Sequence, residues 1–533
     1  MNATHRVSLH TTAEERRIGS LREFFGSPQG RAALLGLLGA IVLVIGGLGS
    51  GSLRRHDALL ENMQLGWLRY GHGMVISSIL LWAGVLVMIW AWARLGRLTL
   101  RGGVTLAGLR LTVLIWTVPL LLSVPLFSRD AYSYIAQGAL LRDGFNPYKV
   151  GPVANPGVIL DNVSTVWTTT PAPYGPAFML TAKTVTMIAG DNVVAGTLLM
   201  RAAMLPGLLL TLWAVPRLAR YLGGNPAVAI WLAVLNPLVL IHLIGGVHNE
   251  VLMVGLMTAG LVLALQRHHA AGIAVVTTGL AVKATAGVAL PFIVWIWMVH
   301  LREDAAERGE TPSHPLVLFA RTAIPGVAVF AIVLAAISFA AQLGLGWLTA
   351  LQGSALIVNW LSLPTILAHI VTWFTSFPLM SVLDITRLIC GAAMVIILVT
   401  VWWRGRHSQR DAVLGLLLAL LAIVVLSPAA LPWYYSWPIA IAAGFALSTR
   451  SLVILAGLSV WLMVIFRPDG AHGMYDPIHV ALAFAAAFIA ARSLTVEDPL
   501  RLRQLVRVKP KQAAVPGTHD PGTQSPSTQA PTA

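Results

Sequence analysis

"PLFSRDAYSYIAQGALLRDGFNPYKVGP" (residues 125–152) places three basic residues, two aspartates and three tyrosines directly after an apolar run. The chain as a whole is strongly apolar, with 57% of its 533 residues hydrophobic and only 11% charged. Its mean hydropathy is +0.76. Soluble domains carry charge on about a quarter of their residues. The sequence therefore predicts an integral membrane protein in which this polar segment leaves the bilayer.

The apolar runs are about 15–24 residues long, which suits bilayer-spanning helices rather than outer-membrane strands. We therefore expect an all-α polytopic bundle of about 14 transmembrane helices, with a range of 12–14. The predicted spans are 32–49, 72–92, 108–127, 192–214, 226–244, 250–266, 270–284, 287–300, 319–342, 386–403, 411–428, 434–449, 451–466 and 476–492. Residues 1–31 precede this membrane domain of 32–492, and 493–533 form a basic, then Pro/Thr-rich tail that we expect to be disordered.

Positive charge predicts the orientation, because Lys and Arg are enriched in cytoplasmic loops. The arginine clusters fall on one side if both termini are cytoplasmic in the plasma membrane. Residues 174–190 are apolar enough to span, but a span there would put Arg217 and Arg220 outside. We therefore expect 174–190 to be an interfacial half-helix within a long extracytoplasmic loop, residues 128–190.

Several function classes are disfavoured by the sequence. The net charge of +15 could suggest nucleic acid, but the arginines lie in short clusters between apolar runs, so no nucleic-acid partner is expected. The only cysteine, Cys390, permits neither an intramolecular disulfide nor a cysteine metal site. The chain contains no Gly-Lys dipeptide, which excludes a phosphate-cradling ATPase loop.

The unusual polar residues gather on the predicted outer side, where ionisable groups at membrane depth suggest a functional site. Each cluster also has a simpler interpretation when it is taken alone. Asp130 and Arg129 could be an ion pair at a helix end, and His248–Glu250 could cap a turn. Lys283 could extend to the headgroups, and Trp433–Tyr435 could belong to an aromatic belt. Because all these clusters lie on the same predicted side of the membrane, we favour the functional interpretation.

A site without ATP can use a donor that is activated by a lipid phosphate. Displacing the phosphate by a sugar hydroxyl requires a carboxylate base, and cations where charge develops. Asp130 is the candidate base, and a single base fits inversion at the anomeric carbon. The candidate donor-phosphate ligands are Lys283, Arg129 and Arg467. The candidate sugar and acceptor ligands are Tyr132, Tyr134, His248, Asn249, Glu250, Trp433, Tyr434 and Tyr435. We expect neither a metal nor a cofactor, since no cluster has metal-ligand spacing.

Five motifs carry a resemblance to a known family: "FSRDAYSYIAQGALLRDGFNPY", "APYGPAF", "NPLVLIHLIGGVHNE", "AVKATAGVALPF" and "PAALPWYYSWP". They resemble the actinobacterial polyprenyl-phosphomannose-dependent α-(1→6)-mannopyranosyltransferases, of the GT-C class, over residues 25–490. "GSLRRHDALLENMQLGWLRYGHG" and "RPDGAHGMY" are more similar to the A member than to the B member. The resemblance implies a GT-C bundle, Asp130 as catalytic residue, and a decaprenyl-phosphate β-mannose donor. It also implies an α-(1→6)-mannan acceptor of lipomannan and lipoarabinomannan synthesis.

Two alternatives remain open. A lipid-linked sugar flippase or other transporter would place ionisable residues near the bilayer midplane, in broken helices of matched halves. We see no such matched halves, and the polar clusters lie on one side. A GT-C transferase of another lipid-phosphate sugar would share the same catalytic requirements. Transfer of labelled mannose would separate both alternatives from the mannosyltransferase.

Overall fold

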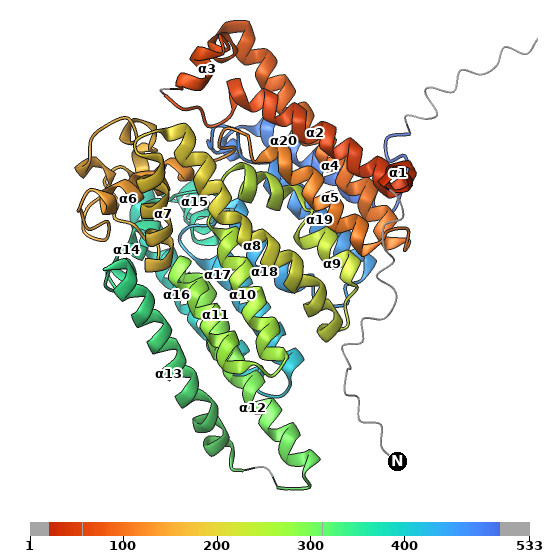
Figure 1. Cartoon of the computed structure of the whole chain (residues 1–533), viewed down its shortest axis with the longest axis vertical. Coiled ribbons are helices and arrows are strands. Elements are labelled where there is room, and N and C mark those ends of the chain that lie inside the picture. Colours follow the sequence, from red (N-terminus) through yellow and green to blue (C-terminus); the bar gives the residue numbers. More distant parts are fainter. Residues whose placement is uncertain (1–20, 56, 312, 502–533) are drawn as a thin grey trace, which may run out of the picture.

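The computed structural model describes residues 21–55, 57–311 and 313–501, so much of the N-terminal segment and of the C-terminal tail lies outside the described residues. Within these ranges the regular elements are helices, and pairing between extended segments is limited to two isolated bridges. The helices pack as one bundle (Figure 1). The prediction of an all-α polytopic membrane protein is confirmed.

Seven helical segments in the described part of the chain are long and apolar enough to cross a membrane. They are α2 (Pro28–Ser50), α4 (Gly71–Leu100), α8 (Val193–Leu222), Ala284–Glu307 (η6, Ala284–Ala289, with α12, Leu290–Glu307), α13 (Pro315–Ala341), α16 (Leu379–Arg404) and α17 (Gln409–Leu426). Seven shorter apolar helices accompany them in the described residues: α5 (Leu106–Leu120), α7 (Pro176–Ala189), α10 (Glu250–Leu265), α11 (His269–Val282), α15 (Leu363–Phe374), α19 (Thr449–Val464) and α20 (Pro477–Ser493). The count of about 14 transmembrane helices stays a prediction.

Two expected spans differ from the structure. The span expected at 226–244 is two helices, α9 (Pro226–Ala233) and the π-helix η5 (Leu238–Gly245), with a bend of 50° between them. Pro237 lies at this break and supplies no N–H to continue the first helix. The span expected at 434–449 is a 3-10 turn, η8 (Pro432–Tyr435), followed by the seven-residue α18 (Ser436–Ala442). All of α18 is buried inside the protein, so its apolar residues pack against other helices.

The loop that begins at residue 128 contains two helices, α6 (Asp130–Arg142) and α7 (Pro176–Ala189), which lie together at one end of the bundle (Figure 1). The helix expected at 174–190 is therefore present as α7. Gly138 of α6 lies against the backbone of Ala182 in α7, and a Cβ atom at position 138 would collide with the Ala182 carbonyl. This close approach fixes which face of α6 turns away from α7.

The turn that contains His248 is set deep in the bundle. Gly207 of α8 packs against the Val251–Leu252 backbone at the start of α10, where a Cβ atom would not fit. Since α8 begins at Val193 and a helix rises 1.5 Å per residue, this contact lies about 20 Å from the N-terminal end of α8. The first turn of α10 is therefore level with the middle of α8.

Arg201 of α8 connects the segment that follows α5 with the end of η5. Its side chain is 1% exposed and donates hydrogen bonds to four backbone carbonyls, those of Leu121, Ser123, Ile244 and Gly245. These carbonyls follow α5 and end η5, where helices leave C=O groups without intrahelical partners. The guanidinium therefore fixes both chain segments relative to each other.

Candidate active site

A cavity of about 240 Å³ lies between α6, the segment 167–174, η6, the end of α17 and the η8–α18 corner. Asp130 and Lys283 line this cavity together with the aromatic rings of Tyr434 and Trp437. Other polar residues in the lining are Ser133, Gln137, Thr170, Thr285 and Ser427. The space suits a group of the size of a sugar ring.

Four predicted site residues from three separate regions of the chain form one cluster, of which Asp130 and Lys283 line the cavity. Asp130 is the first residue of α6, Glu250 is the first residue of α10, and Lys283 follows the end of α11. The Nδ1 atom of His248 lies 3.5 Å from Asp130 Oδ2 and 4.0 Å from Glu250 Oε2. The Lys283 ammonium forms an ion pair with the Glu250 carboxylate. The structure thus brings two carboxylates, an imidazole and a cation together.

The aromatic residues of the "PWYYSW" segment face this cluster. Lys283 Nζ lies 4.5 Å from the centroid of the Tyr434 ring and 5.6 Å from that of Trp437, within cation–π range. The Trp433 ring stacks on His248 with centroids 3.9 Å apart and an interplanar angle of 22°. Trp433 is only 4% exposed. These rings contact His248 and Lys283 inside the protein, so they do not form an aromatic belt at the lipid interface.

Asp130 is electrostatically suited to exchange a proton near neutral pH. Burial, together with the negative charge of the Glu250 carboxylate, raises the pKa of Asp130 to about 6. The Lys283 ammonium and hydrogen bonds from Ser128 and Trp167 act against this shift. A general base works best when its pKa lies near the working pH.

The backbone is strained shortly before Asp130 and directly before His248. Phe127 and Val247 have φ angles of +61°, in the left-handed region that non-glycine residues seldom adopt. Such a conformation costs of order 1–3 kcal/mol and tends to occur at functional sites. Both residues are fully buried, so the surrounding packing holds Asp130 and His248 in their positions.

Three predicted ligands point elsewhere. Arg129 donates from Nε and Nη2 to the Asn162 carbonyl, at 3.1 and 2.8 Å, and from Nη1 to the Leu53 carbonyl at 3.1 Å. The Tyr132 hydroxyl donates to the Ser52 carbonyl at 2.6 Å, and Arg467 forms an exposed ion pair with Asp476 at 2.8 Å. Among the described residues that line the cavity, Arg129, Tyr132 and Arg467 are absent. Their phosphate- and sugar-binding roles stay predictions.

The remaining predicted ligands surround the cluster. Tyr134 makes edge contacts with Tyr174 and Phe178 at 5.3 and 4.9 Å, so it supports the cavity wall. Tyr435 is half-buried and packs against the core. Asn249 is fully buried, and neither atom of its amide has a hydrogen-bond partner in the described part of the chain.

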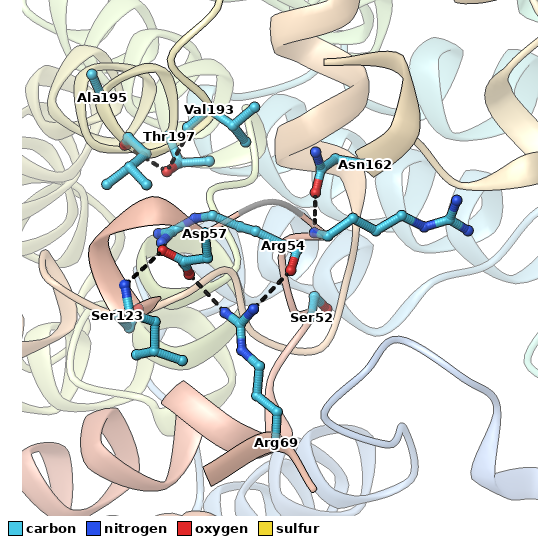
Figure 2. A network of polar contacts seen from close by, with 12 residues as sticks. Ser52, Arg54, Asp57, Arg69, Ser123, Asn162, Val193, Ala195 and Thr197 are labelled. Carbon is cyan, nitrogen blue, oxygen red and sulfur yellow. Dashed lines mark hydrogen bonds and ion pairs between the residues drawn. The ribbon is translucent and has the colours of Figure 1, made fainter. Parts of the chain in front are cut away.

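A charged network in the segment 51–70 was not anticipated. Asp57 accepts hydrogen bonds from Arg54 at 3.0 Å and from Arg69 at 2.6 Å (Figure 2). The Asn162 side chain accepts from the Arg55 backbone N–H at 2.8 Å, which ties this segment to the loop around α6 (Figure 2). The run "LRRHD" in a loop between two apolar runs is the sequence signal for such a network.

An apolar groove of about 520 Å³ adjoins the polar cavity. It runs between α11, η6, α12, α13 and the short α14 (Trp347–Ala350), and its lining consists of hydrophobic side chains and glycine. Ala284, the residue after Lys283, lines both the groove and the cavity. α13 forms the edge of the bundle beside this groove (Figure 1). An apolar chain with a polar head would fit the two spaces together.

No group of three or more His, Cys, Asp or Glu residues within 21–55, 57–311 and 313–501 could hold a metal ion. The expectation that the protein needs no metal remains untested.

Comparisons with known proteins place the chain in a class. Residues 33–299 match the family model "Alpha-(1->6)-mannopyranosyltransferase, N-terminal domain", and residues 362–496 match "MptB C-terminal domain". The protein is a membrane-embedded glycosyltransferase.

The relatives narrow this class further. The chain is 54% identical to alpha-(1->6)-mannopyranosyltransferase A of Mycobacterium tuberculosis, over 89% of this chain and 91% of the relative. It is 36% identical to the enzyme of the same name from Corynebacterium glutamicum, over 84% and 95%, and 29% identical to the B enzyme of that organism, over 78% and 72%. The chain belongs to the alpha-(1->6)-mannopyranosyltransferase family.

Proposed function

We propose that the protein transfers mannose from polyprenyl (decaprenyl) phosphate β-mannose to the 6-hydroxyl of an α-(1→6)-mannan acceptor, with inversion and with Asp130 as general base. The acceptor is the growing backbone of lipomannan and lipoarabinomannan, at the extracytoplasmic face of the plasma membrane. One observation carries this proposal: a cavity with a carboxylate and an ammonium group adjoins an apolar groove at Ala284.

The donor fits across the cavity and the groove. The polyprenyl chain lies in the groove, and the phosphate lies at Lys283, which is adjacent to the shared residue Ala284. Attraction between an ammonium and a phosphate is stronger in this partly water-free site than in bulk water. The Lys283–Glu250 pair keeps the ammonium oriented before the donor binds.

Asp130 takes the proton of the acceptor hydroxyl as that oxygen attacks the anomeric carbon. The new C–O bond forms on the face opposite the phosphate, while the bond from the anomeric carbon to the phosphate oxygen breaks. Lys283 stabilises the negative charge that develops on the departing phosphate. A β-linked donor thus yields an α-linked product with one base, and no second carboxylate is needed as a nucleophile. His248 lies between the two carboxylates, with Nδ1 3.5 Å from Asp130 Oδ2 and 4.0 Å from Glu250 Oε2.

The test uses membranes that contain the protein, labelled polyprenyl-phosphomannose and a synthetic α-(1→6)-dimannoside. We expect a labelled trimannoside that depends on this chain and is lost in Asp130→Asn. Movement of the labelled lipid across the membrane without transfer would support the flippase instead. Transfer only from another lipid-phosphate sugar would contradict the donor assignment. Transfer that survives EDTA would support the absence of a metal.

A further inference from the structure

The face of α6 that continues from Asp130 carries two polar side chains with no assigned role. Ser133 and Gln137 lie three and seven residues after Asp130, so they share one face of the helix. All three residues line the polar cavity. Gly138 packs against Ala182 of α7. The face of α6 that carries Asp130, Ser133 and Gln137 lies beside this contact and lines the cavity.

Both side chains are buried and incompletely bonded. Ser133 and Gln137 are each 3% exposed, and Ser133 Oγ and Gln137 Oε1 have no hydrogen-bond partner in the described part of the chain. This differs from nearby helical hydroxyls. Thr181 and Thr197, for example, donate to the carbonyl one turn back at 2.9 and 3.0 Å. A buried polar group without a partner costs about 1–3 kcal/mol.

We infer that Ser133 and Gln137 form a subsite that binds hydroxyl groups of a mannosyl residue in the cavity. A sugar offers hydroxyls that both donate and accept, and the hydroxyl and carboxamide groups match both roles. The inference rests on the proposed function and deepens it by naming the groups that recognise the sugar. The recognised hydroxyls belong to the donor mannose or to the terminal acceptor mannose, which share this chemistry.

The subsite predicts how much kcat/KM falls when the substrate lacks one hydroxyl. A site built to bond a hydroxyl rejects the deoxy analogue because its own polar groups stay unpaired. We expect wild-type protein to lose roughly 10-fold or more in kcat/KM with the deoxy analogue of the recognised position. Gln137→Leu lacks the carboxamide and Ser133→Ala/Gln137→Leu lacks both polar groups, so each should process the parent and the analogue of the hydroxyl it no longer bonds within about 3-fold of each other.

The experiment measures this ratio in two arms. One arm supplies singly deoxygenated mannosyl donors with the parent acceptor, and the other supplies the parent donor with deoxygenated dimannosides. Because the ratio is taken within one preparation, it does not depend on the folded fraction. Thr181→Val removes a hydroxyl from α7 outside the cavity and should keep the wild-type ratios. The arm in which discrimination disappears identifies the sugar.

Unchanged ratios in both arms for both cavity variants would overturn the subsite. Transfer of mannose by the wild-type protein from parent donor to parent acceptor tests the proposed function separately. A wild-type protein without that transfer refutes the function, whereas normal transfer with unchanged ratios refutes only the subsite.

Discussion

His248 Nδ1 lies 3.5 Å from Asp130 Oδ2, which connects the first residue of α6 with the turn before α10. The imidazole also stacks on Trp433, so its plane is fixed by an aromatic ring from the C-terminal part of the chain. Three segments that are distant in sequence thus meet beside the Asp130 carboxylate. This fixed surrounding suits the general-base role that we propose for Asp130.

Asp130→Asn keeps the shape of the side chain and removes the proton acceptor. Loss of a general base costs about 10²–10⁴-fold in rate, so we expect near-background mannosyl transfer with normal insertion. Labelled transfer in membranes is the measurement. Asp143→Asn is the matched control, because Asp143 ends the same helix in an ion pair with Arg142. Activity of Asp130→Asn within about threefold of wild type contradicts the assignment, since an exposed ion pair contributes about 1 kcal/mol or less.

The pH dependence of transfer should report the raised pKa of Asp130. The base must be ionised, so the wild-type rate should fall as the pH drops through about 6. Glu250→Gln removes a negative charge that raises this pKa, so the acid limb should move to lower pH. Lys283→Met removes a charge that lowers it, and the limb should move to higher pH. Limbs that coincide in all three proteins would exclude Asp130 as the titrating base.

Lys283→Met should weaken use of the donor. A hydrogen bond to a charged group contributes about 1.5–3 kcal/mol, which corresponds to a rise in donor KM of about 10- to 100-fold. The variant leaves the Glu250 carboxylate buried without its partner, so Lys283→Met/Glu250→Gln is measured as well. Lys149→Met replaces an exposed lysine of the loop 128–190 and should behave as wild type. A normal donor KM in both variants that lack Lys283 would show that Lys283 does not bind the donor phosphate, and would favour its contact with lipid headgroups.

The orientation can be tested by cysteine labelling, because Cys390 is the only cysteine of the chain. In a Cys390→Ser background, Val158→Cys should react with a membrane-impermeant maleimide from outside. His407→Cys should react only after permeabilisation. Both side chains are exposed in the structure, so access to the reagent decides the result. Labelling of both positions from the same side would reject the topology and the extracytoplasmic site.

Arg201→Met should destabilise the protein strongly. Four carbonyls lose a charged donor in a buried region, so the free energy of unfolding should fall by at least about 3 kcal/mol. Thermal unfolding in detergent measures the change. Arg55→Met alters an exposed side chain and should cost about 1 kcal/mol or less. Equal melting temperatures for the two variants would show that the four bonds contribute little.

Hydropathy predicted the helical membrane fold because apolar composition reflects removal from water. It could not separate burial in lipid from burial in protein, and α18 shows the difference. Residues 436–442 are apolar because other helices surround them, and seven residues are too few to span a bilayer. The break at Pro237 was also missed, since the surrounding run is apolar on both sides.

The site was predictable in part. Asp130, His248, Glu250 and Lys283 were selected because ionisable residues in apolar surroundings are costly, and the structure brings them together. Ser133 and Gln137 carry no charge, so only their helical spacing from Asp130 could have indicated them. The direction of Arg129 could not be predicted either, because it depends on the Leu53 and Asn162 carbonyls from distant segments.

The cavity wall is shared between the two regions that match separate family models. Asp130 and Lys283 belong to residues 33–299, whereas Tyr434 and Trp437 belong to residues 362–496. Neither region encloses the cavity without the other. A chimera that joined the first region to the second region of a distant relative would inherit one side of the Lys283–Tyr434 contact from each parent. A substitution on either side of this contact therefore changes the surroundings of a residue in the other region, and we expect the two regions to vary together around the cavity.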